Sequence, residues 1–168
     1  MMKRKVMMIL GLTAVLSLLM AIGVSAAGQS ELAQVRAATA QFHRVEAAQA
    51  AGYDLVPGLD HCFDNLGVGG MGFHYINVDL LDLTLDPLQP EALVYAPGQD
   101  GRLHLAAVEY VVPAELWDAE YDEPPTVLGQ HLHLNEELGI YALHAWIWHH
   151  NPAGMFEDWN PRVSCPAK

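Results

Sequence analysis

The residues of this sequence best suited to chemistry are histidines and one carboxylate in segments with the pattern of strands. His131 and His133 are separated by one residue, so on a strand both imidazoles project from one face, about 7 Å apart. Glu109 interrupts an aliphatic strand face, where an ionised carboxylate is costly unless a cation or donors lie beside it. The pattern predicts a metal site with these ligands: His74, Glu109, His133 and His144, with His131 as an additional candidate.

Imidazole and carboxylate donors suit several transition metals, and the spacing does not choose among Zn, Cu, Fe, Mn and Ni. An open coordination position would let the ion activate water or dioxygen, whereas a closed site would sequester or sense it. Two alternatives without a metal also fit these residues. The histidines and the glutamate can form a buried hydrogen-bond network, or the protein can be a non-catalytic extracellular binding or structural module. The residues assign no catalytic group and do not decide whether the protein is an enzyme.

The segments around these residues predict an α+β fold. The alanine-rich stretch from Glu31 to Ala51 carries apolar residues at the spacing of one helical face. Alternation and turn signals predict five strands, at Phe73–Val78, Ala92–Tyr95, Arg102–Val112, Gln130–Leu134 and Ile140–His149. The hairpin signal at Pro97–Gly101 favours antiparallel pairing. We therefore expect one N-terminal amphipathic helix packed on a mostly antiparallel sheet, or a small open β-barrel, of about five strands.

The first 26 residues have the pattern of a secretory signal peptide. Lys3, Arg4 and Lys5 precede an uncharged run from Val6 to Val24, and small residues follow up to Ala26. The apolar run is also long enough for an uncleaved membrane anchor, which is the competing reading. We expect cleavage after residue 26, which leaves residues 27–168 as a single domain in the periplasm or the extracellular space.

The charge of the chain excludes several classes of partner. Loss of residues 1–26 removes three cations and no acid, so the formal net charge falls from −12 to −15. Such a surface repels nucleic-acid phosphates and anionic lipid headgroups. A metal ion or a small molecule is therefore the expected partner, with no nucleic acid and no membrane after cleavage.

Two cysteines, Cys62 and Cys165, are present in a chain that reads as exported. In an oxidising compartment they are expected to form one disulfide. The bond would close a loop of roughly 100 residues, for which loss of chain entropy in the unfolded state gives about 4–5 kcal/mol of stabilisation.

Four segments carry a resemblance to known proteins: CFDNLGVGGMGFHYIN from Cys62, DPLQPEALVYAP from Asp86, VEYVVP from Val108 and ALHAWIWHHNPAGMFEDWNPRVSC from Ala142. Together they resemble a group of uncharacterised secreted bacterial proteins. The resemblance spans most of the chain after the signal segment. It implies a single exported domain, and it implies no activity, ligand or catalytic residue.

Overall fold

The computed structural model describes residues 28–166, so the expected signal segment lies outside the described residues. Residues 28–39 are helical. They are followed by the helical elements η1 (Ala40–His43), α2 (Val45–Ala50), η2 (Val78–Leu80) and α3 (Ala114–Asp118). The strands are β1 (Asp54–Leu55), β2 (Phe63–Asn65), β3 (Gly69–Ile76), β4 (Ala92–Pro97), β5 (Leu103–Pro113), β6 (Thr126–Val127), β7 (Gln130–His131), β8 (His133–Asn135) and β9 (Ile140–Ala145). Within residues 28–166, no helix has the length and apolarity needed to cross a membrane.

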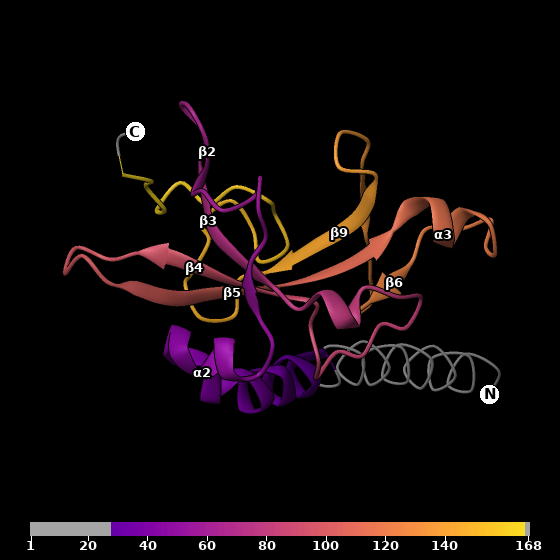
Figure 1. The fold of residues 1–168 in the computed structure, drawn as a ribbon, viewed down its shortest axis with the longest axis horizontal. Coiled ribbons are helices and arrows are strands. Elements are labelled where there is room, and N and C mark those ends of the chain that lie inside the picture. The colour runs from indigo at the N-terminus through magenta and orange to yellow at the C-terminus, as the bar shows by residue number, and fades with distance from the viewer. Residues whose placement is uncertain (1–27, 167–168) are drawn as a thin grey trace, which may run out of the picture.

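A seven-stranded sheet forms the body of the molecule (Figure 1). Its order is β1-β3-β4-β5-β9-β8, with β2 also paired to β3, and every one of these pairings is antiparallel. Strands β6 and β7 form a separate two-stranded sheet. The fold is a mixed α/β arrangement whose sheet is not closed into a barrel, so of the two expected architectures the open sheet is the one that forms.

Strand β5 lies inside the sheet, between β4 and β9, and both of its faces are covered. Val108, Tyr110 and Val112 belong to the main core, together with residues of the N-terminal helical segments. Ala107 belongs to a smaller cluster on the opposite face. Alternate residues point to opposite faces of a strand, so Glu109 also lies on the side away from the helices.

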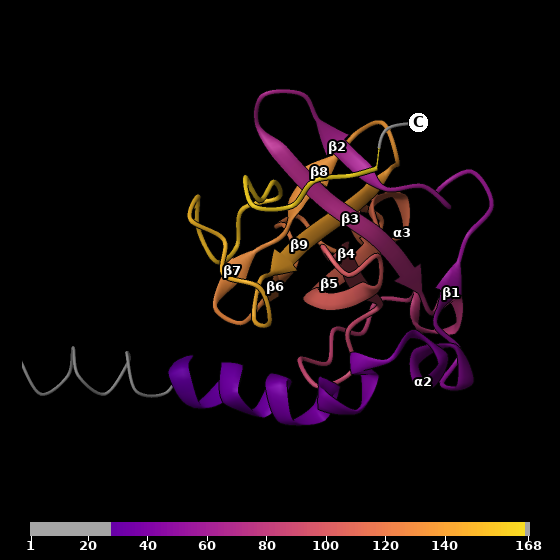
Figure 2. The same ribbon diagram turned by 90° about the vertical axis from the view of Figure 1, so that its left-hand side faces the viewer.

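The N-terminal helical segments, from residue 28 to the end of α2, cover one face of the sheet, as Figures 1 and 2 show. The expected single helix over residues 31–51 is divided, because Arg44 adopts an extended backbone with φ −101° and ψ 128° between η1 and α2. The carbonyl of Phe42 accepts a hydrogen bond of 2.6 Å from the Tyr95 hydroxyl. This bond to the sheet takes the place of a helical N–H donor at the break.

The C-terminal tail crosses the face of the sheet opposite the helices. Gly70 and Asn160 exchange two backbone hydrogen bonds of 3.0 and 3.1 Å. The Cys62–Cys165 disulfide joins the end of the tail to the residue before β2, with a Cα–Cα distance of 5.6 Å. A side chain at Gly69 would overlap the Asn160 carbonyl, so the glycine permits the close approach of the tail. These contacts fix the tail over β3.

Candidate metal centre

Three side chains from separate strands meet on the tail side of the sheet: His74 of β3, Glu109 of β5 and His144 of β9. The register of β5 and β9 places Glu109 directly opposite His144. On the intervening strand β4, Val94 is the partner of His74 and Ala92 the partner of Glu109. Because these two β4 residues are short, the longer imidazole and carboxylate side chains meet above them.

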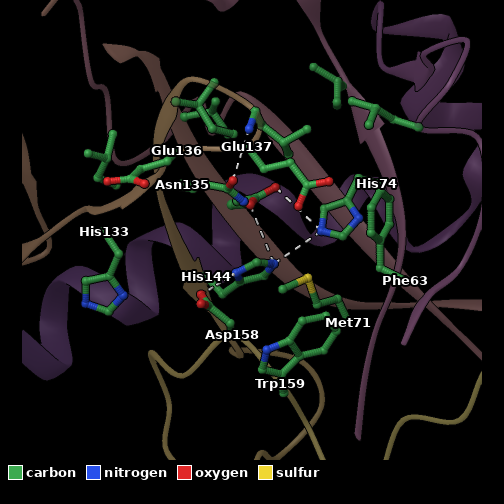
Figure 3. A pocket seen from close by; sticks show the side chains of 18 of the residues that line it. Phe63, Met71, His74, His133, Asn135, Glu136, Glu137, His144, Asp158 and Trp159 are labelled. Atoms are coloured by element: carbon green, nitrogen blue, oxygen red, sulfur yellow. Dashed lines mark hydrogen bonds and ion pairs between the residues drawn. The ribbon is translucent and has the colours of Figure 1, made fainter. Parts of the chain in front are cut away.

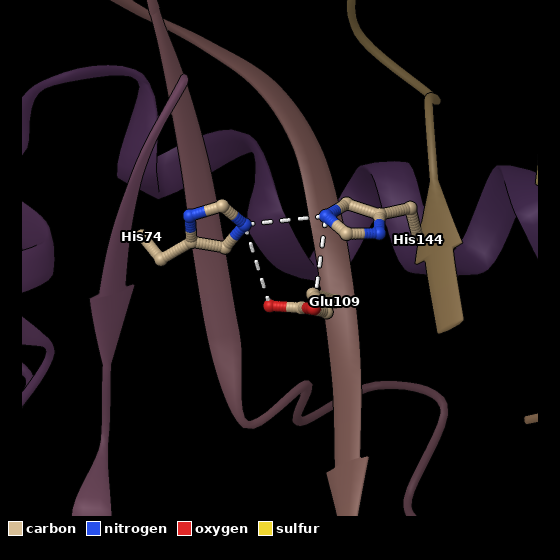
Figure 4. Close-up of side chains that lie close together, drawn as sticks. All are labelled: His74, Glu109 and His144. Atoms are coloured by element: carbon tan, nitrogen blue, oxygen red, sulfur yellow. Dashed lines mark hydrogen bonds and ion pairs between the residues drawn. The ribbon is translucent and has the colours of Figure 1, made fainter. Parts of the chain in front are cut away.

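The donor atoms of the three residues face one another, as Figure 4 shows. The two imidazole Nε2 atoms are 3.2 Å apart. Glu109 places Oε2 3.6 Å from Nε2 of His74 and Oε1 3.6 Å from Nε2 of His144. The side chains of His74, Glu109 and His144 are only 8%, 10% and 2% exposed, so bulk water does not screen this group.

These separations match those of ligands around a single ion. Zn²⁺ bonds of about 2.0–2.1 Å at tetrahedral angles hold neighbouring donor atoms about 3.3–3.4 Å apart. The observed distances of 3.2, 3.6 and 3.6 Å lie close to that value, with the last two measured to different oxygens of Glu109. The two-histidine, one-carboxylate donor set is used by catalytic zinc sites and by non-haem iron sites. The His74, Glu109 and His144 group can therefore hold a metal ion without rearrangement of its strands.

A fourth residue, Asp158 from the tail, orients His144. Its Oδ1 lies 3.3 Å from Nδ1 of His144. A carboxylate accepts, so the proton of the neutral imidazole belongs on Nδ1 and the lone pair on Nε2 points at the group. Metal-binding histidines are usually held in this way by a second carboxylate or carbonyl.

The electrostatics of the group favour one positive charge at its centre. Burial lowers the pKa of His74 to about 4, although Glu109 opposes this effect. Burial also acts to lower the pKa of His144, but Glu109 and the hydrogen bond to Asp158 outweigh it and raise that pKa. The hydrogen bond from His144 in turn lowers the pKa of Asp158. Without a metal, a single proton on His144 would supply the charge that the buried carboxylate needs.

One atom of the group has no hydrogen-bond partner within the described part of the chain. Nδ1 of His74 is buried and unpaired. A buried imidazole with one unsatisfied nitrogen is costly, and such atoms are rare in folded proteins. A metal ion bound at Nε2 would leave Nδ1 equally without a partner, although metal-bound histidines usually donate this second N–H to the protein. In a metal-free network, His74 would also share one Nε2 between a second imidazole nitrogen and a carboxylate. The sharing of Nε2, and not the unpaired Nδ1, is therefore the feature that favours a ligand set over a hydrogen-bond network.

The group lies at the base of a cavity of about 910 Å³ (Figure 3). Part of the wall is apolar and aromatic, with Phe63, Met71 and Trp159 close to the two buried imidazoles. Phe63 meets His74 edge to face, with ring centroids 5.1 Å apart. This volume is within the range of small-molecule sites.

The structure places the other two predicted ligands outside this group. His133 lines the cavity but is exposed, and Figure 3 shows it apart from the buried imidazoles. His131 is exposed and lies 3.1 Å from the Thr126 hydroxyl. The two do not share a strand face, because β7 pairs with β6 whereas β8 pairs with β9. Leu132 between them is buried in the core, which is where the chain passes from one sheet to the other.

Asp158 is the residue of the site that the sequence pattern did not identify. It lies in a tail without regular periodicity, 14 positions beyond the histidine that it contacts. The sequence feature that could have placed Asp158 near the site is the disulfide. Cys165 ties the tail to Cys62, close to the strand that carries His74. Three comparisons, with protein-family models, with curated proteins and with solved structures, found no match for the chain.

Proposed function

We propose that this is an exported protein that binds one transition-metal ion through His74, Glu109 and His144, with a coordination position open to the cavity. The observation that carries the proposal is the convergence of two Nε2 atoms and one carboxylate at 3.2–3.6 Å in a buried site. The metal would be Zn²⁺ or Fe²⁺ in the first instance, because both are bound by this donor set.

The open position rests on the number of ligands and on the cavity. Structural zinc sites use four protein ligands, whereas catalytic sites use three and leave one position for water or substrate. Here three protein donors converge at the base of a cavity of about 910 Å³. An ion held there would act as a Lewis acid or would activate a bound water. We therefore favour a binding or hydrolytic role for the centre over pure sequestration.

Export is supported by the disulfide and by the N-terminal pattern. A stable disulfide is typical of an oxidising compartment, and Cys62 and Cys165 are bonded. The signal-like sequence over residues 1–26 agrees with that location. The resemblance to secreted bacterial proteins points the same way.

The alternative is a metal-free module in which the three residues act as a hydrogen-bonded core cluster. Their mutual contacts within ion-pair distance favour that reading. Equilibrium dialysis separates the two functions: the metal-free protein is dialysed against Zn²⁺ or Co²⁺, and bound metal is counted. We expect about one ion per chain in the wild type and none in His144→Gln.

His133→Gln is the matched control, because this histidine lines the same cavity but lies outside the donor group. It should retain full metal binding. Circular dichroism and thermal unfolding report whether each variant folds, and the Co²⁺ visible spectrum reports whether nitrogen and oxygen donors bind the ion. A wild type that binds no ion, or a His144→Gln variant that is folded and binds metal as the wild type does, would refute the proposal.

A further inference from the structure

The permanently charged side chains that line the cavity above the three donor residues are acidic. Glu136 and Glu137 lie at its exposed rim, and Asp158 lies at its inner wall beside His144. Among residues 28–166, the lining contains two further histidines, His61 and His133, but neither lysine nor arginine. Any charged group of a ligand that lies in this cavity therefore meets acidic side chains.

The arginines of the described residues lie elsewhere. Arg36 donates a hydrogen bond of 2.7 Å to the carbonyl of Ile147. Arg44 and Arg102 line a separate cavity of about 560 Å³, and Arg162 does not contribute to the lining of the larger cavity. Apart from the proposed metal ion, a phosphate, sulfonate or carboxylate tail on a ligand would consequently find no permanent counter-charge among the described residues that line the larger cavity.

The apolar part of the wall is aromatic and polarisable. Phe63, Met71 and Trp159 are partly exposed and line the cavity near the buried imidazoles. Aromatic faces attract ammonium groups as well as apolar surface, and the attraction grows when the cation is shielded from water. The thioether of Met71 adds an adaptable apolar surface.

We propose that the cavity binds an organic cation: a small molecule with an apolar or aromatic body, an ammonium group, and a donor atom that reaches the metal. The inference deepens the proposed metal function and rests on it for the donor atom. The preference for positive charge comes from the chain itself, from Glu136, Glu137 and Asp158 together with the aromatic wall. A bound divalent ion adds positive charge at the inner end of the cavity and reduces this preference, so the preference should be larger in the metal-free protein.

The test uses three hydroxamates of one shape, which supply the same metal-binding head. They are benzohydroxamic acid, its 4-aminomethyl derivative and its 4-carboxy derivative. Binding to the Zn²⁺-loaded protein is measured by isothermal titration calorimetry. We expect the aminomethyl compound to bind about tenfold tighter than the carboxy compound, or more, with the neutral compound between them. The ratio should shrink as salt is added.

The double variant Glu136→Gln with Glu137→Gln should bring the affinities of the charged compounds together. The matched control, Glu115→Gln with Glu120→Gln, removes two exposed acids that do not line the cavity and should preserve the preference. Equal affinities in the wild type, tighter binding of the carboxy compound, or an unchanged ratio in the rim variant would each overturn the inference.

Failure of this inference is distinguishable from failure of the metal function. Metal content is measured on the same samples, so loss of the metal site is seen directly. The charged pair is also titrated into the metal-free protein, where both should bind more weakly but in the same order. Metal binding without that order would leave the metal function intact and refute only the ligand class.

Discussion

Replacing Asp158 with Asn tests whether the tail tunes the metal centre. The substitution preserves shape but removes the carboxylate that accepts the Nδ1 proton of His144 at 3.3 Å. An asparagine can present its amide nitrogen to Nδ1 of the imidazole, which would favour the other tautomer. The proton would then lie on Nε2, the nitrogen whose lone pair binds the metal. Asp158→Asn should therefore weaken metal binding without removing a ligand.

The size of the effect follows from the position of Asp158. Loss of a residue that orients a metal ligand costs 10- to 100-fold in affinity, or about 1.4–2.7 kcal/mol. The Asp158 side chain is 42% exposed, and its bond to His144 is 3.3 Å rather than a short charge-assisted contact. Solvent screening therefore places the expected loss near the lower end, at about 10- to 30-fold.

The assay is competition for Zn²⁺ between the protein and a fluorescent chelator of known affinity at neutral pH. Glu157→Gln is the control, because it removes the same charge from the adjacent exposed residue. That control should bind Zn²⁺ as the wild type does. Wild-type affinity in Asp158→Asn would refute a role of Asp158 in metal binding. Equal losses in both variants would refute it too, because a general change in charge would then explain them.

Three predictions concern stability. Burial raises the pKa of Glu91 to about 8, with a hydrogen bond from the Val111 N–H opposing the rise. Between pH 4.5 and 8 the folded state therefore keeps the Glu91 proton that the unfolded state loses. As the pH rises through this window, the free energy of unfolding of the wild type relative to Glu91→Gln should fall by up to about 5 kcal/mol. Denaturant unfolding at several pH values measures the difference. Removing the disulfide with Cys62→Ser and Cys165→Ser should cost about 4–5 kcal/mol in urea unfolding, because the bond spans 103 positions. Gly69→Ala should cost about 2 kcal/mol or more, because its Cβ would overlap the tail backbone, and it should also weaken Zn²⁺ binding.

Each of these predictions has an outcome that contradicts it. A difference between the wild type and Glu91→Gln that stays constant from pH 4 to 9 would show that this carboxyl group titrates normally. A disulfide-free protein of unchanged stability would show that the tail is held by its other contacts alone. Gly58→Ala is the control for the glycine, because Gly58 also has positive φ but no atom near its Cβ position. Equal losses at both positions would assign the cost to backbone strain rather than to the tail.

Much of the site was predictable because strand alternation is a local property. The spacing around His74, Glu109 and His144 indicated which residues share a face, and the carboxylate among aliphatic neighbours indicated a partner nearby. The structure brings these three together. The disulfide was predictable for a similar reason, because two cysteines in a chain that reads as exported leave one pairing.

The remaining features depend on long-range contacts. His131 and His133 have the spacing of a ligand pair, yet burial of Leu132 divides them between two sheets. At the break in the helix at Arg44, the Phe42 carbonyl accepts a hydrogen bond from Tyr95 of β4, a residue far along the chain. Short strands such as β1, β2 and β6 have too few residues for alternation to be visible.

Metal binding by His74, Glu109 and His144 is tested most directly by the metal content of the protein isolated from its host. The protein would be purified without an affinity tag or chelator, and its metals would be counted by mass spectrometry. We expect close to one equivalent of a single transition metal, lost in folded His74→Gln and His144→Gln variants and retained in His133→Gln. Absence of metal, together with no thermal shift on addition of Zn²⁺, Fe²⁺, Mn²⁺, Ni²⁺ or Cu²⁺, would contradict it and assign the three residues to a structural cluster.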